Sequence, residues 1–231
     1  MNYEALDKAL KYLDDNEVVN EDGTMVAAGL AAVAIALVGV IALAVQNGKN
    51  KPIKNAIEDK KVQDSLKKIV SETQKGLESS AFKKYNKFVN YKVPYSYDID
   101  KKATNDSTVV VKFPIMKFDV EGILKDQYNL KTDDDVEGFV YGDTQPYAKK
   151  APKLKNYILG MLKDANSFVS KNINSKSKFS AQIVPAIKEP KKIEEELDEY
   201  YDSYLPGHGE DYLGINLVLS FDKKNFISKE V

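Results

Sequence analysis

The stretch Met25–Val45, MVAAGLAAVAIALVGVIALAV, constrains this chain more than any other part of it. It contains 21 residues and no charged or polar side chain. A helix of this length spans roughly 31 Å, close to the ~30 Å hydrocarbon core of a bilayer. The stretch therefore predicts a long apolar helix that is either transmembrane or buried in a protein assembly. A cleaved signal peptide is a third interpretation.

The signal peptide fits less well, because the segment before the stretch is long and acidic. Residues 1–24 carry 2 Lys and 7 Asp or Glu, a net charge of −5, whereas the n-region of a signal peptide is short and basic. Lysines follow the stretch, beginning with Lys49 and Lys51, and lysines near a membrane end favour the cytoplasmic side. We therefore expect a single-pass membrane protein with its C-terminal domain on the cytoplasmic side, or a virion protein.

Small residues within the stretch predict a helix-packing interface. At helical spacing, five of them share one face: Ala28, Ala32, Ala36, Gly39 and Ala42. Side chains this small let another helix approach closely. The face therefore predicts self-association or a close protein partner, whether the surroundings are lipid or protein.

The pattern of apolar and polar residues divides the chain into four parts. Residues 1–24 indicate a short acidic amphipathic helix, with its apolar spacing over 2–15, and residues 25–45 form the apolar, transmembrane-type helix. Residues 49–80 indicate a lysine-rich amphipathic helix or stalk, and residues 81–231 an α+β domain. Within the stalk, the helical spacing runs over residues 51–78.

In the C-terminal part, β-branched and aromatic runs predict strands, and apolar residues at helical spacing predict helices. The predicted strands are 108–118, 136–141, 179–187 and 213–221, and the predicted helices are 153–173 and 191–204. Pro114 lacks an N–H group, which predicts an edge position or a bulge for the first strand. The fold class is therefore α+β: N-terminal helices including the long apolar one, then a roughly four-stranded β-sheet with two helices.

The chain offers few residues for catalysis or metal binding. It has no Cys, and its one histidine, His208, lies in a loop with Glu210 and Asp211. Such a loop could hold a divalent metal or act as acid and base, so a small membrane-anchored enzyme or a metal-binding protein is one alternative. Asp133–Gly138 is similar to the start of a calcium loop, but Thr144 stands where a bidentate Glu is required. No catalytic, cofactor-binding or metal residue is assigned.

All 34 basic residues are lysine. Arginine is the residue best suited to gripping phosphate, so its absence disfavours nucleic acid as a partner. Residues 82–97 nevertheless interleave lysines with aromatic rings that could stack on single strands, and a nucleic-acid-binding module at a membrane is a second alternative. Charge also alternates in blocks, from 12 Lys and 5 acids in 49–92 to no Lys and 8 acids in 193–211. Such blocks favour a charge-complementary assembly.

These observations predict a non-enzymatic, membrane-inserted structural or assembly protein that associates with itself through the small-residue face. Its expected partners are membrane lipid, copies of itself or other protein subunits, and no cofactor or small-molecule substrate is identified. In composition, a lysine-rich, arginine-free chain with a short apolar helix is similar to viral membrane-active or internal virion proteins. A virion component is therefore the favoured version.

Overall fold

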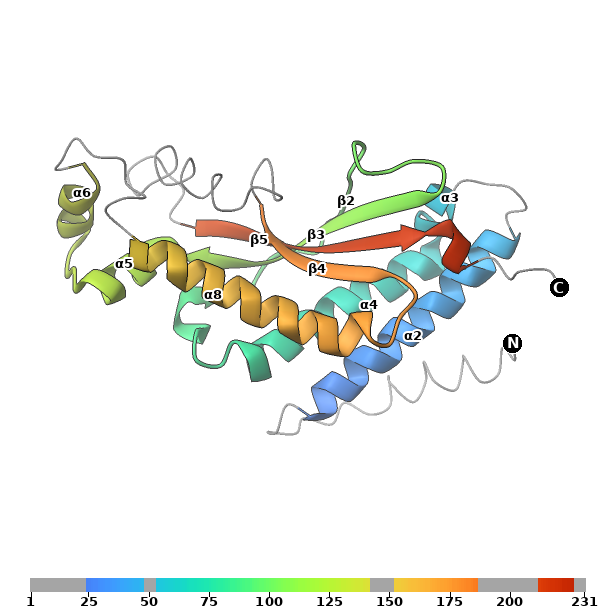
Figure 1. Ribbon diagram of the computed structural model, residues 1–231, viewed down its shortest axis with the longest axis horizontal. Helices are drawn as coiled ribbons and strands as arrows, with labels where there is room; N and C mark the ends of the chain where they lie inside the picture. The colour runs from blue at the N-terminus through green and yellow to red at the C-terminus, as the bar shows by residue number, and fades with distance from the viewer. Residues whose placement is uncertain (1–23, 48–52, 142–151, 187–211, 227–231) are drawn as a thin grey trace.

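A computed structural model describes residues 24–47, 53–141, 152–186 and 212–226 of the chain (Figure 1). In this part of the chain, six α-helices accompany one five-stranded antiparallel sheet. The predicted α+β class is confirmed. The sheet has five strands where four were expected, because three of the predicted strands form and two unpredicted strands of two residues each join them.

The sheet has the strand order β1-β3-β5-β4, and β2 also pairs with β3. The strands are β1 (Val89–Asn90), β2 (Asp98–Ile99), β3 (Thr108–Asp119), β4 (Ser180–Pro185) and β5 (Tyr212–Asp222). The three long ones confirm the predictions over 108–118, 179–187 and 213–221. Burial alternates along β3 and β5, so one face of the sheet supplies the core and the other stays partly open.

Pro114 marks a bulge within the sheet. The register between β3 and β5 shifts between Pro114 and Met116, as predicted. β3 is nevertheless an inner strand of the sheet. On the side away from β5, it pairs with β1 after the bulge and with β2 before the bulge. Between those two short strands, the side-chain amide of Gln74 donates to the carbonyl of Ile115 at 2.6 Å. Proline is tolerated because that interval needs no ladder hydrogen bond from its nitrogen.

Two helices replace the single one predicted over 51–78: α3 (Ile53–Ile57) and α4 (Lys60–Gly76). Asp59 separates them. Its backbone is extended, and its carboxylate accepts a hydrogen bond from the Lys61 amide at 2.9 Å, which is the geometry of a helix N-cap.

The strand predicted over 136–141 is wrong, because these residues lie in helix α6 (Asp133–Tyr141). Thr132 and Asp135 form a reciprocal cap: the Asp135 amide donates to the Thr132 hydroxyl at 3.0 Å, and the Thr132 amide donates to the Asp135 carboxylate at 2.9 Å. Three acids in the first turn also favour a helix start. Helix α5 (Val120–Tyr128) precedes it.

Helix α8 (Pro152–Val169) continues into a π-turn, Ser170–Asn174, which confirms the helix predicted over 153–173. Figure 1 shows α4 and α8 on the same side of the sheet. The helices predicted over 2–15 and 191–204 lie outside the described residues.

Helix α2 (Thr24–Asn47) forms where the apolar stretch predicted a helix. In the described part of the chain, however, no helix is found that could cross a membrane. The expected membrane-type helix is thus not found. The middle of α2 instead packs along α4, and its large side chains are at most 1% exposed there: Leu30, Val33, Leu37 and Ile41.

The α2–α4 packing places the apolar helix beside a charged one. The outer faces of α4 carry exposed lysines, among them Lys60, Lys61 and Lys67. If α2 lay in a bilayer, the membrane would have to accommodate the charged lysines of α4, or α2 would have to separate from α4. The buried side of α2 belongs to the same apolar core as α4, α8 and the sheet.

Close packing of α4 and α8 depends on Gly76, the last residue of α4. A Cβ atom there would lie 2.4 Å from the ring tip of Phe168 on α8, so no other residue fits without a shift. At Gly160, within α8, an added Cβ would meet nothing within 4 Å. The two glycines therefore form a matched pair.

We predict that Gly76→Ala lowers the free energy of unfolding by about 1–3 kcal/mol, the usual cost of overpacking. Gly160→Ala should raise it by about 0.5–1 kcal/mol, because alanine is the better helix former. Urea unfolding monitored by circular dichroism measures both. Equal effects of the two substitutions would show that the α4–α8 contact is not tight.

Candidate functional site

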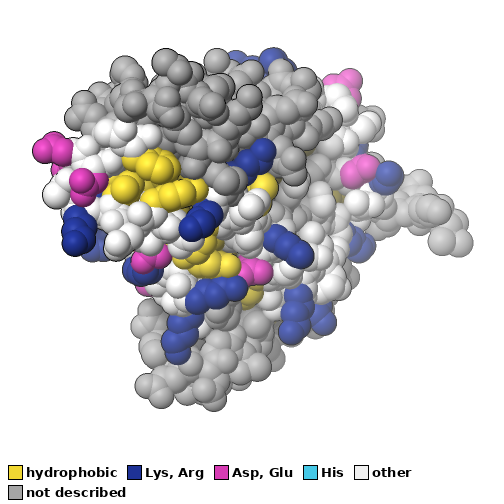
Figure 2. All heavy atoms as spheres, turned by 60° about the vertical axis from the view of Figure 1, so that its left-hand side comes forward, with side chains coloured by type: hydrophobic (Ala, Val, Ile, Leu, Met, Phe, Trp, Pro, Cys, Tyr) yellow, Lys and Arg dark blue, Asp and Glu magenta, His cyan; other side chains and the backbone are white. Residues whose placement is uncertain are grey.

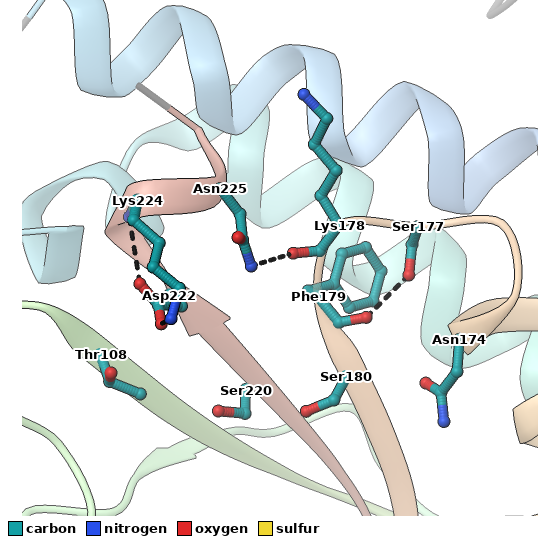
Figure 3. Close-up of a pocket in the computed structure, with 10 residues that line it drawn as sticks. All are labelled: Thr108, Asn174, Ser177, Lys178, Phe179, Ser180, Ser220, Asp222, Lys224 and Asn225. Atoms are coloured by element: carbon teal, nitrogen blue, oxygen red, sulfur yellow. Dashed lines mark hydrogen bonds and ion pairs between the residues drawn. The ribbon is translucent and has the colours of Figure 1, made fainter. Parts of the chain in front are cut away.

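An open hollow of about 800 Å³ lies at the end of the sheet where β3 and β4 begin and β5 ends (Figure 3). Two turns complete its wall, one before β4 and one after β5. Its lining residues are Thr108, Asn174, Ser177, Lys178, Phe179, Ser180, Ser220, Asp222, Lys224 and Asn225. Apart from Phe179, all of these side chains are polar or charged.

Three hydroxyl groups form a row across the floor of the hollow. Ser180 and Ser220 are direct cross-strand partners on β4 and β5. Thr108 on β3 is the partner of Asp222 and so lies diagonally from Ser220 (Figure 3). Within the described part of the chain, these hydroxyls have no hydrogen-bond partner. Sequence reasoning missed all three, because only the register of three distant strands brings them together.

The charges around the hollow are partly neutralised. The Asp222 carboxylate pairs with the Lys224 ammonium at 2.9 Å, and the hydrogen bond from Lys224 lowers the pKa of Asp222. The Lys178 side chain extends away from the hydroxyl row in Figure 3. This arrangement can hold a small polar group by hydrogen bonds from the three hydroxyls.

A second polar feature lies on the partly open face of the sheet. The Lys112 ammonium on β3 forms an ion pair with Asp100 at 2.8 Å, and both side chains are less than one-third exposed. This hydrogen bond from Lys112 is the main reason that the pKa of Asp100 is lowered. Asp100 also accepts the backbone amides of Lys102 and Ala103 at 3.0 and 3.1 Å. The pair therefore anchors the β2–β3 loop.

We predict that Asp100→Asn lowers stability at pH 7 by about 0.5–1 kcal/mol, because it removes a partly exposed ion pair and leaves an oxygen for the loop amides. A lowered pKa means that the contribution is complete above the ordinary value of 3.8 and disappears as the pH falls below it.

The stability curves of wild type and Asp100→Asn should therefore converge below pH 3.8. Thermal unfolding from pH 7 downward tests this. Asp106→Asn is the control, since Asp106 is exposed in the same loop and forms no ion pair with another described residue. A difference between wild type and Asp100→Asn that does not vary with pH would contradict the assignment.

The lysine–aromatic segment 82–97 is largely occupied within the protein itself. Lys84 pairs with Asp164 at 2.8 Å and Lys87 with Asp126 at 2.6 Å. Tyr85 packs edge-on against Tyr157 with ring centroids 5.4 Å apart. Figure 2 shows the end of the molecule that carries α5 and α6, where lysine and acidic side chains intermingle around apolar groups. These contacts favour a structural role for the segment over the stacking of bases.

The helix-packing residues predicted on α2 are divided by the structure: two of the four described ones are buried and two are half-buried. Ile35, between them, is 57% exposed. Ala32 and Ala42 are half-buried, and Gly39 is buried. Ala36 is only 3% exposed. The side chain of Ala28 lies outside the described residues.

The metal and acid–base candidates fall in two different parts of the chain. The loop of His208 lies outside the described residues. The calcium-like acids begin helix α6, where Asp133 pairs with Lys125 at 2.5 Å and Asp135 caps the helix. Within the described ranges, no group of three or more His, Cys, Asp or Glu residues could hold a metal ion.

We compared the chain with known proteins by sequence and by fold. No protein-family model, curated protein sequence or solved structure matches it. No residue of these surfaces therefore inherits a role from a relative.

Proposed function

We propose that the chain is a non-enzymatic assembly protein that associates with a second copy of itself through the outer face of α2. One observation carries this proposal: α2 buries one side against α4, while Ile35 on its other side is 57% exposed. The outer side of a surface helix is normally polar. The half-buried side chains beside Ile35, such as Val38 and Ala42, are also apolar, and a contiguous apolar surface supports an interaction there.

The side chains around Ile35 favour a second helix as the occupant. Ala32 and Ala42 are small and half-buried, so another helix can approach the backbone of α2 closely. The face carries no charge, and it can therefore meet an identical face without repulsion. A two-fold contact of this kind is the commonest form of self-association.

Protein is favoured over hydrocarbon as the material that covers this face. The exposed lysines of α4 run beside α2, and burying them in a bilayer would be costly. The same lysines could contact anionic headgroups at a membrane surface. We therefore keep a virion component as the favoured setting, with a membrane-bound assembly as the alternative.

We predict that wild-type protein sediments as a dimer or larger species, and that Ile35→Glu weakens association at least about 100-fold, because an unpaired charge would be buried in an apolar contact. Sedimentation velocity over a concentration series measures this. Ala32→Leu should also weaken association by blocking close approach while keeping the face apolar. Gln182→Glu, which adds the same charge at an exposed position on β4, should have no effect.

A wild type that remains monomeric at high concentration would refute the self-association. Flotation of the protein with anionic lipid vesicles distinguishes the membrane version. If wild type floats and Ile35→Glu does not, while neither self-associates, lipid rather than a second copy covers the face.

A further inference from the structure

Strand β4 forms one edge of the described sheet, where β5 is its one strand partner among the described residues. In an antiparallel strand, alternate residues direct their N–H and C=O groups away from the partner. On β4 those residues are Ala181 and Ile183, whose backbone groups bond to side chains outside the sheet. An unpaired row of such groups is a template for a strand from another molecule.

Two asparagine side chains occupy this row. The amide of Asn174 donates to the Ala181 carbonyl at 3.0 Å and accepts from the Ala181 N–H at 2.7 Å. The amide of Asn166 does the same at Ile183, with distances of 2.8 and 2.9 Å. Each side chain thus makes the two hydrogen bonds that a peptide group of a neighbouring strand would make. We call Asn166 and Asn174 the amide clasp.

The next residue in the outward series needs no such partner. Pro185 follows Ile183 at the same alternation and has no N–H group to leave unpaired. The clasp thus occupies two of the three outward positions of β4, and Pro185 at the third offers an incoming strand no donor.

We propose that the amide clasp acts as a substitute strand that prevents β4 from pairing edge to edge with β4 of a second copy of this chain. Edge strands are usually protected by charged side chains, and β4, Ser180–Pro185, carries none. Two copies of this uncharged strand could therefore pair antiparallel without repulsion. The clasp confines self-association to other surfaces, and its action does not depend on α2.

The clasp could instead serve only to hold α8 on the sheet, and the test must separate these roles. Asn172 provides the control, because it lies in the same π-turn as Asn174 and, among the described residues, its amide donates only to the Phe168 carbonyl, at 2.8 Å. Asn172→Ala therefore removes a local hydrogen bond without exposing β4. The chain has no cysteine, so a single introduced thiol reports on one position.

The experiment uses full-length protein carrying Ile35→Glu to suppress association through α2, and Gln182→Cys to mark β4. Adding Asn166→Ala and Asn174→Ala leaves the N–H and C=O groups of Ala181 and Ile183 without partners. The variant should therefore form a dimer in sedimentation velocity, and disulfide formation through position 182 should become at least about tenfold faster. Asn172→Ala in the same background should do neither. Folding of each variant is checked by circular dichroism.

A folded clasp variant that stays monomeric overturns the proposal, as does a dimer that does not cross-link through position 182. An equal increase with Asn172→Ala also overturns it. If the double variant does not fold, Asn174→Ala alone is used, and hydrogen exchange of the wild type decides independently. The backbone amides of Ala181 and Ile183 must exchange as slowly as the β4 amides that are hydrogen-bonded to β5. If they exchange as fast as exposed amides, the proposal is rejected. Association through α2 is scored separately, in protein that retains Ile35.

Discussion

The antiparallel pairing of β3 with β5 is the contact on which the rest of the structure depends. It runs from Thr108 opposite Asp222 to Asp119 opposite Tyr212, interrupted once by the bulge after Pro114. The alternate apolar residues of both strands form a continuous buried face, and α4 and α8 cover it. The short strands, the hollow and the β2–β3 loop all take their positions from this pair.

Side-chain amides hold the helices to both edges of the sheet. Gln74 on α4 bonds to the interval that β1 and β2 leave open on β3, and the amide clasp from α8 and its π-turn bonds to β4. A carboxamide suits this role because it offers a donor and an acceptor at peptide-like spacing. The same bonds that fix the helices also satisfy backbone groups that would otherwise be left unpaired.

Elements with a clear periodicity of apolar residues can be predicted from the sequence. Elements that form only through contact with a neighbouring strand cannot. The alternation in β3 and β5 and the helical spacing of α8 were sufficient to predict them. Val89–Asn90 and Asp98–Ile99 are strands only because β3 lies beside them, and Thr108, Ser180 and Ser220 meet only through strand register. The apolar stretch predicts a helix but leaves its surroundings open, because lipid and a packed neighbouring helix select the same residues. The apolar residues of Val136–Tyr141 suggest a strand, and only the cap formed by Thr132 and Asp135 shows that a helix begins here.

The central position of β5 has a consequence for how the chain reaches this fold. β5 is the last strand in the described sequence, yet it lies between β3 and β4 in the sheet. The sheet cannot close until residue 222 has left the ribosome. Among the described strands, β4 has no partner until then, and β3 can pair only with the two-residue strands β1 and β2. Contacts between segments so distant in the chain slow folding, and the exposed apolar strands of the waiting chain are open to aggregation. Chaperone dependence and folding rate should therefore be governed by β5 rather than by the N-terminal helices.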